Sequence, residues 1–250
     1  MRNVIKGWYS YLLVFFYICN IQAQLDPIEH SLLTKYDQSI GLENTGLYKG
    51  ILYVKEYTSQ ENNHQYFKSS NSLTGTITYE GQKYYEQELK YNLVEDQLII
   101  TLKNSLGHNN ALIVNKNNVS SFIIDGHKFA RTNNYLSTID SSPINFFLEI
   151  LLENDTFSFL KNTKKTVQKV INDGKVVYEF RNKTTYFLHY KNQLYKIKSK
   201  KDLLNIFKEY KNDLKPIKRN KTQLTTKQKL FLSMLKRVQL LQEQDAKTTT

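Results

Sequence analysis

The sequence predicts a mainly β protein with a smaller helical part. Its strands are expected to form an antiparallel meander, with a curved half-barrel as a variant, and two C-terminal helices are expected to follow. Short runs of β-branched and aromatic residues recur through the middle of the chain, and residues that accept a positive φ separate them. After residue 198 the apolar period changes from two to that of a helix. The expected parts are a signal peptide at 1–23, an N-terminal segment with the first strand at 24–65, a β domain at 66–198, helices at 199–245 and a frayed tail at 246–250.

The first 23 residues have the order of a secretory signal peptide. The basic MRNVIKG precedes the apolar WYSYLLVFFYICNI, and Ala23 supplies a small residue for cleavage. The apolar run is shorter than the roughly 20 residues that span a bilayer. We therefore expect a mature protein that starts near Gln24, periplasmic or secreted, with no stable membrane span. Lipidation at Cys19 is disfavoured, because Ile18 stands where a small residue is normally required.

Cleavage would also remove the only cysteine of the chain. The mature protein would then have no disulfide, no thiol nucleophile and no cysteine metal ligand. Its stability would depend on an apolar core, for which about 225 residues suffice.

The net charge of +12 is distributed unevenly. Residues 24–160 carry −6, residues 161–221 carry +13 and residues 222–250 carry +3. A basic region attracts anionic surfaces or acidic partners. Nucleic acid is not expected, because an exported protein rarely meets it and because lysine, not arginine, dominates.

The predicted turns of the meander come in chain order. They are Glu80-Gly81, Asn115 to Asn118, Asp125-Gly126, Asp173-Gly174 and Lys191-Asn192. Each is typical of a hairpin, and short connections of this kind join antiparallel neighbours. The chain lacks the alternation of strands and helices that a parallel nucleotide-binding sheet requires.

Period-2 alternation assigns faces to the central strands. The expected inner face consists of Tyr85, Gln87, Leu89 and Tyr91 in one strand and Leu98, Ile100 and Leu102 in the next. The expected wet face of the first strand consists of Tyr84, Glu86, Glu88 and Lys90. Paired carboxylates can perform acid and base catalysis, but on an exposed strand they are more often charges that protect the sheet edge.

Two helices are expected near the C-terminus. Ser199 and Asp202 form a capping box, and apolar residues then recur at helical spacing until Pro216. A second helix is expected to begin near Thr225 or Thr226. Its apolar stripe consists of Leu230, Phe231, Met234, Leu235, Val238 and Leu241. Packing on the protein's own sheet is favoured over a partner or membrane helix.

Several motifs resemble a family of uncharacterised secreted proteins of Gram-negative bacteria. They are Gly75-x-Ile77-x-Tyr79-x-Gly81-Gln82-x-Tyr84, Leu89-x-Tyr91-Asn92-Leu93-x-x-Asp96, VSSFIIDGHKF and YFLHYKNQLYKIKSKKDLLNIF. The resemblance covers about 66–221. It implies two strands around residues 153–155, where periodicity also allows a helix after Pro143. It implies no activity, and Asn92 stands where relatives often carry aspartate.

No catalytic, cofactor-binding or metal-binding residues are expected. Familiar nucleophile, zinc, phosphate and dinucleotide motifs are absent from the sequence. The five histidines, His30, His64, His108, His127 and His189, do not have the spacing that places two imidazoles on one metal. His127 is expected at the surface and His189 partly buried.

The sequence therefore predicts an exported, non-enzymatic binding or accessory module of the bacterial periplasm or cell envelope. Lys198, Lys200 and Lys201, at the start of the first helix, are the candidate contacts to an anionic surface. The partner would be an envelope protein, an anionic surface or an apolar ligand. The alternative function is a carrier or chaperone for a lipid-like ligand, and an enzyme of unknown reaction is less favoured.

Overall fold

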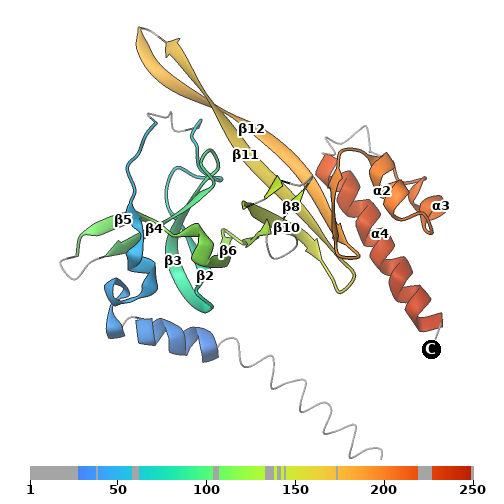
Figure 1. The fold of residues 1–250 in the computed structure, drawn as a ribbon, viewed down its shortest axis with the longest axis horizontal. Helices are drawn as coiled ribbons and strands as arrows, with labels where there is room; N and C mark the ends of the chain where they lie inside the picture. The colour runs from blue at the N-terminus through green and yellow to red at the C-terminus, as the bar shows by residue number, and fades with distance from the viewer. Residues whose placement is uncertain are drawn as a thin grey trace, which may run out of the picture. The chain divides into compact units, whose positions relative to one another are not determined.

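The computed structural model describes residues 28–37, 39–57, 62–103, 107–132, 138–139, 142–143, 145–172, 174–218 and 227–248. The predicted class is confirmed: the protein is mainly antiparallel β, with helices near its C-terminus (Figure 1). Two compact units are present. The first comprises Met1–Glu56, Phe67–Asn92 and Gln97–Gly126, and the second Tyr57–Tyr66, Leu93–Asp96 and His127–Thr250. The expected signal peptide and its cleavage site lie outside the described residues.

The first unit contains six antiparallel strands. They are β1 (Ile51–Leu52), β2 (Leu73–Tyr79), β3 (Gln82–Asn92), β4 (Gln97–Lys103), β5 (Asn109–Ile113) and β6 (Val119–Ile124). Their order is β1-β5-β4-β3-β2-β6. A helical stretch at 28–37 and the 3-10 turns η1 (Leu42–Asn44) and η2 (Gly46–Lys49) precede them, and η3 (Lys116–Asn118) lies between β5 and β6.

One of the predicted hairpins of this unit is confirmed and another is wrong. Glu80 and Gly81, with φ of 51° and 84°, join the paired strands β2 and β3. Asn115 to Asn118 do not form a hairpin turn, because β5 pairs with β4 and β1 whereas β6 pairs with β2. The Asn115 side chain accepts a hydrogen bond from the Asn117 N–H and starts the turn η3. Local turn chemistry is similar in the two cases, so it does not distinguish a hairpin from a crossover.

A β-bulge in β3 changes the predicted faces. Gly75 lies opposite Gln87 and Ile77 opposite Tyr84, so Tyr85 and Glu86 together face one residue of β2. Glu86 has a φ of 54°. The extra residue shifts the alternation. Tyr84, predicted on the wet face, is therefore buried with 4% of its surface exposed, and Tyr85 is only half-buried.

Beyond the bulge the predicted inner face is confirmed, whereas the predicted wet face is confirmed only in part, because Lys90 is half-buried. Gln87, Leu89 and Tyr91 are buried, whereas Glu86 and Glu88 are exposed. The predicted inner residues of β4 are buried as well, and so is Ile99 between them. Gly75 is required for close packing here, because a Cβ at this position would lie 2.2 Å from the carbonyl oxygen of Ile123.

The second unit contains a five-stranded antiparallel sheet. The strands are β7 (His127–Arg131), β10 (Phe147–Glu153), β11 (Phe157–Asn172), β12 (Lys175–Tyr190) and β13 (Gln193–Ile197), in that spatial order. A separate pair consists of β8 (Thr138–Ile139) and β9 (Ser142–Pro143). Among the described strands β1 pairs with β5 alone and β13 with β12 alone. The antiparallel sheet is therefore open.

The turns of the second unit follow the sequence prediction. The two strands expected around residues 153–155 are present, and Asn154 Oδ1 accepts hydrogen bonds from the N–H groups of Thr156 and Phe157 at 2.9 and 2.8 Å. Lys191 and Asn192, with φ of 50° and 57°, connect β12 to β13. Between β11 and β12 the closing pair is Asn172 and Lys175; Asp173 lies outside the described residues.

The first C-terminal helix is two short helices, contrary to the single helix predicted. α2 (Lys200–Ile206) ends at Phe207, whose φ of −101° and ψ of 65° are not helical, and α3 (Lys211–Leu214) follows. The Phe207 side chain is fully buried against the rings of Phe157 and Tyr190. Apolar residues continue at helical spacing beyond Phe207, but the tertiary packing of its ring overrides this local preference.

The last helix, α4 (Lys227–Thr248), packs on its own unit, as the sequence favoured. Phe231, Met234, Leu235 and Val238 are fully buried and share a core with Phe159 and other residues of the sheet. The helix continues to Thr248, into the segment expected to be frayed, and the expected start at residues 225–226 lies outside the described residues. In the part of the chain that the structure describes, every helix is too short or too polar to cross a bilayer.

Candidate functional site

Two of the three lysines predicted to contact an anionic surface are exposed, and one is not free. Lys198 and Lys201 lie on the surface. Lys200 is half-buried, and its ammonium donates hydrogen bonds to the carbonyl oxygens of Lys215 and Ile217, both at 2.6 Å. These carbonyls follow the C-terminal end of α3, where cations are favourable. Lys200 therefore has a structural role, which the sequence prediction of a surface contact did not include.

An exposed basic element is the outer half of the β11–β12 hairpin. The two strands pair along their whole length, from Phe157 opposite Tyr190 to Asn172 opposite Lys175. The neighbouring strands end early: β10 pairs with β11 only as far as Lys161, and β13 pairs with β12 only as far as Tyr186. Residues 164–183, here called the arm, are thus a two-stranded ribbon without a further strand on either side in the described chain (Figure 1).

A segment before β2 supports the inner part of the arm. The Tyr57 ring contacts the rings of Tyr178 and Phe180 edge to face, at centroid distances of 5.2 and 5.7 Å. Asn63 bonds both backbone groups of Phe180, accepting from its N–H at 2.6 Å and donating to its carbonyl at 3.4 Å. The ribbon is therefore held in place as far as Tyr178.

Lys165 belongs to this support and is not a surface charge. Its Nζ donates to the carbonyl oxygens of His64 and Tyr66 at 2.5 and 3.0 Å. Burial of the ammonium lowers the pKa of Lys165. Lys169, Lys175 and Lys183, in contrast, are exposed.

The end of the arm carries aliphatic residues on both faces. Val170 lies opposite Val177, and Ile171 lies opposite Val176. Ile171 is 78% exposed and Val176 47% exposed. Because strand neighbours point to opposite faces, these two pairs make both surfaces of the tip apolar. Lysines 169 and 175 directly adjoin the four residues, here called the tip.

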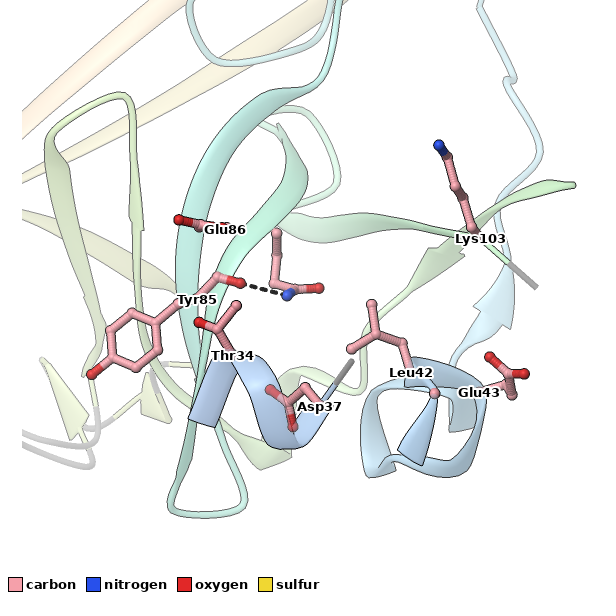
Figure 2. Close-up of a pocket in the computed structure, with 9 residues that line it drawn as sticks. Thr34, Asp37, Leu42, Glu43, Tyr85, Glu86 and Lys103 are labelled. Atoms are coloured by element: carbon pink, nitrogen blue, oxygen red, sulfur yellow. Dashed lines mark hydrogen bonds between the residues drawn. The ribbon is translucent and has the colours of Figure 1, made fainter. Parts of the chain in front are cut away.

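A second candidate site is a pocket of about 300 Å³ in the first unit (Figure 2). The helical stretch 28–37 contributes Thr34 and Asp37, the following turn contributes residues 41–43, and the bulge of β3 contributes residues 85–87. Lys103, at the end of β4, completes the lining. The sequence offered no motif for this pocket, because the bulge that shapes it has no sequence signature.

Asp37 is the unusual group of the pocket. It is 4% exposed. Its Oδ1 accepts one long hydrogen bond from Gln82 Nε2 at 3.4 Å, whereas Oδ2 is buried and has no hydrogen-bond partner among the described residues. The hydroxyl of Thr34, one helical turn earlier, is also buried without a partner. Burial raises the pKa of Asp37.

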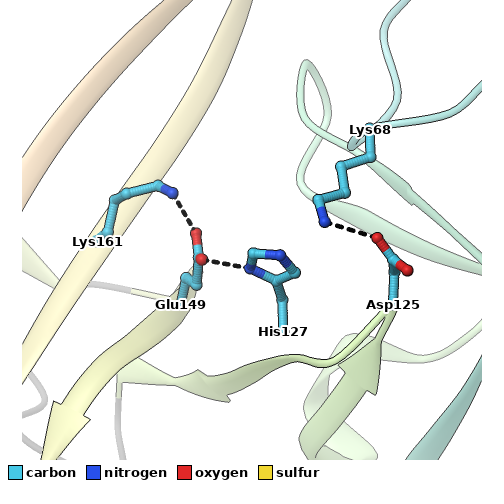
Figure 3. Close-up of polar contacts among 5 residues, drawn as sticks. All are labelled: Lys68, Asp125, His127, Glu149 and Lys161. Carbon is cyan, nitrogen blue, oxygen red and sulfur yellow. Dashed lines mark hydrogen bonds and ion pairs between the residues drawn. The ribbon is translucent and has the colours of Figure 1, made fainter. Parts of the chain in front are cut away.

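A buried carboxylate lies in the second unit, where the sequence suggested none. Glu149 of β10 is almost fully buried; His127 Nδ1 lies 2.7 Å from one of its oxygens and Lys161 Nζ lies 2.5 Å from the other (Figure 3). His127 was expected to be a simple surface residue, but it is half-exposed and paired. Figure 3 also shows an exposed ion pair of the first unit, Lys68 with Asp125 at 2.6 Å.

The Glu149 cluster is satisfied in charge, so it is most simply a cross-strand link. Glu149 lies opposite both Lys161 and Phe129, on the two neighbouring strands. The only signal in the sequence is a glutamate inside the apolar run FFLEILL, because buried acids are rare unless paired. Burial, and then the charge of Glu149, raises the pKa of the neighbouring Tyr186.

The histidines stay separate among the described residues. No group of three metal-ligating side chains in that part of the chain is arranged to hold a metal ion. His189 is half-buried, as expected, and burial lowers its pKa. It lines a pocket of about 410 Å³ with the β10–β11 turn, and a neighbouring pocket of about 340 Å³ lies between that turn and α4. Most residues that line the first of these two pockets carry polar side chains, whereas small-molecule sites are lined mainly by apolar ones.

Comparison of the chain with protein-family models, with curated proteins and with solved structures finds no match. The candidate sites therefore have to be interpreted from their own chemistry.

Proposed function

We propose that the protein is exported and acts, without catalysis, as a binding module of the bacterial cell envelope that attaches to an anionic lipid surface through its arm. The observation that carries the proposal is the combination of exposed lysines with an exposed apolar tip on one projecting ribbon. The signal-like N-terminus and the resemblance to secreted proteins support export.

The charge distribution supports attachment by this end of the chain. Residues 161–221 carry +13, whereas residues 24–160 carry −6. Lysines near an anionic membrane contribute about 1 kcal/mol each to binding. Lys169, Lys175 and Lys183 project from the arm and are exposed, so together they would supply attraction that falls as salt increases.

The tip favours a lipid surface over an acidic protein groove. A groove covers one face of a ribbon, but Val170 with Val177 lies on one face and Ile171 with Val176 on the other. Apolar residues beside lysines are typical of interfacial membrane contact. Each strand of the ribbon leaves one edge of backbone groups without a strand partner, so penetration would stop at the interface, roughly 5–10 Å deep.

Co-sedimentation with vesicles tests this function. The exported protein is mixed with phosphatidylcholine vesicles, with or without phosphatidylglycerol, at low salt and at about 0.15 M salt. We expect binding to the anionic vesicles only, weakened by salt. The double variant Lys169→Glu, Lys175→Glu removes about 2 kcal/mol of attraction and adds repulsion, so partitioning should fall by roughly thirtyfold or more.

The matched control is Lys198→Glu, Lys201→Glu, which changes the net charge by the same amount at the start of α2. It should weaken binding much less than the arm variant. Equal partitioning into both kinds of vesicle, or none into either, would contradict a lipid surface as the partner. A larger loss of vesicle binding in the control variant than in the arm variant would indicate that Lys198 and Lys201, and not the arm, contact the membrane.

A further inference from the structure

We infer that the pocket of the first unit is a binding site for a small organic cation, an ammonium or guanidinium compound, which Asp37 and Thr34 hold. This site is independent of the lipid contact proposed for the arm. It lies entirely within the first unit, between the helical stretch 28–37, the turn at 41–43 and the bulge of β3.

The inference is based on two buried oxygen atoms, one of Asp37 and one of Thr34. Buried polar atoms in proteins nearly always have a hydrogen-bond partner, and burying a charge without one is costly. Within the described part of the chain, Asp37 Oδ2 and Thr34 Oγ1 are both buried without a hydrogen-bond partner, and both residues line the same pocket. They are three positions apart on a helical stretch and therefore on one face of it. A group with several N–H donors would satisfy the two oxygens together.

The charges around the pocket favour a cation. Glu43 and Glu86 line it together with Asp37, whereas Lys103 is the only basic side chain among the described residues of the lining. Three carboxylates around a small cavity create a negative potential that attracts a cationic ligand. Figure 2 shows Asp37 on the helical stretch, Glu43 on the following turn, and Glu86 and Lys103 on two separate strands.

A metal ion fits this pocket less well than an organic cation. Among the described residues, no three metal-ligating side chains converge. The volume of about 300 Å³ lies at the lower end of small-molecule sites, which suits a ligand of about amino-acid size.

The β3 bulge gives the pocket one wall. Glu86 has a positive φ, and Gln87 Nε2 donates to the Tyr85 carbonyl at 2.6 Å, which fixes the shape of the bulge. Bulges are frequent next to functional sites because they redirect side chains. The bulge and the unpaired carboxylate are independent observations that fall on the same cavity.

Calorimetric titration with defined probes tests the site. The probes are agmatine and ethanolamine, with ethylene glycol as the neutral control and acetate as the anionic control. We expect saturable binding of at least one cationic probe and none of the controls. Asp37→Asn should weaken binding by about ten- to a hundredfold, because it removes a charge-assisted hydrogen bond. Glu88→Gln, which changes an exposed carboxylate of β3 outside the pocket lining, is the matched control and should leave binding unchanged.

The stability of the ligand-free variant gives a second readout. If Asp37 were kept only for folding, Asp37→Asn would unfold at a lower temperature than the wild type. A carboxylate kept for binding predicts an unchanged or higher unfolding temperature. Thr34→Val, which preserves shape, should also weaken binding and serves if Asp37→Asn does not fold. Absence of saturable binding for both amines, or binding that survives these substitutions, would overturn the inference; vesicle binding by the arm should be unaffected in either case.

Discussion

The ammonium of Lys200 secures the end of the short helix α3. It donates to the carbonyl oxygens of Lys215 and Ile217, which would otherwise lack intrahelical partners. Lys200 is thereby set apart from Lys198 and Lys201, which are exposed. Three lysines that look equivalent in the sequence have two different roles, because only the fold brings residues 215 and 217 next to one of them.

Replacing Lys200 should therefore cost stability. Lys200→Met removes two charge-assisted hydrogen bonds from a half-buried group, and we expect a loss of about 1–3 kcal/mol in the free energy of unfolding. Lys201→Met, on the exposed neighbour, should stay within about 0.5 kcal/mol. Chemical denaturation of the two variants measures the difference, and equal effects would show that the contacts of Lys200 are not stabilising.

Asp202 makes stability depend on pH. Partial desolvation raises its pKa, but the N–H groups of Lys198 and Ser199, which donate to Oδ2 at 2.7 and 2.8 Å, outweigh this and lower the pKa below the ordinary 3.8. A folded-state pKa below the unfolded value contributes stability above pH 3.8 that is lost as the pH falls through the folded-state pKa.

We accordingly expect Asp202→Asn to lose about 1 kcal/mol near neutral pH. The difference from the wild type should shrink as the solution is acidified below pH 3.8. Urea denaturation at a series of pH values measures it. A difference that is constant from neutral to acidic pH would mean that the carboxylate charge does not contribute.

Some residues could be assigned from the sequence and others could not. The capping pair Ser199 and Asp202 is confirmed because both partners lie within one turn of chain. The inner positions of β4, Leu98, Ile100 and Leu102, are confirmed, although Ile99 on the opposite face is buried as well. The pairing of Glu149 with His127 and Lys161 joins three strands, and the orphan oxygen of Asp37 results from a tertiary contact, so neither has a local pattern.

At the scale of single elements, the bulge in β3 has the largest effect. It turns Tyr84 inward, and Tyr85 lies instead against the ring of His30 at a centroid distance of 4.4 Å. A positive φ at a glutamate is uncommon, so an unbroken alternation was the reasonable expectation from sequence. The strand itself was predictable, but the phase of its first residues was not.

The two tyrosines provide a test of the bulge. Tyr84→Ala should destabilise the protein by about 3 kcal/mol or more, as is usual for deleting a buried aromatic ring. Tyr85→Ala should cost clearly less, because its ring is half-exposed. Thermal unfolding of both variants measures the difference. A larger loss of stability for Tyr85→Ala than for Tyr84→Ala would indicate a regular alternation without the bulge.

Hairpins and helices differ in how far local chemistry determines them. The turns at Glu80-Gly81 and Lys191-Asn192 were predictable because two residues with positive φ define both the turn and the pairing. The crossover at Asn115 and the break at Phe207 depend on strand order and on ring packing, which are long-range properties. The strand assignment of β10 and β11 followed from the family resemblance, since periodicity also allowed a helix.

At the scale of the whole molecule, export is a condition for the proposed function. The basic, apolar and small-residue order of the first 23 positions predicts cleavage near Ala23. N-terminal sequencing of the protein recovered from a secreting bacterial host should give a start near Gln24. Recovery from the cytoplasm of a protein that retains Met1 would contradict export, and with it the proposed function in the cell envelope.

The central claim is that the tip of the arm enters an anionic membrane interface. Because the one cysteine, Cys19, precedes the expected cleavage site, the mature chain accepts a single introduced label. Ile171→Cys places an environment-sensitive fluorophore on the tip, and Leu240→Cys places one on the exposed face of α4 as a control. Both parent positions are exposed aliphatic residues, so labelling should leave the core intact.

The most direct measurement is the emission of the two labelled proteins with anionic and with neutral vesicles at low salt. The arm proposal predicts a blue shift and higher intensity for the label at 171 with anionic vesicles, little change at 240, and no change at either position with neutral vesicles. The account would be contradicted if the label at 171 stays in water while the protein sediments with anionic vesicles, or if both labels respond equally.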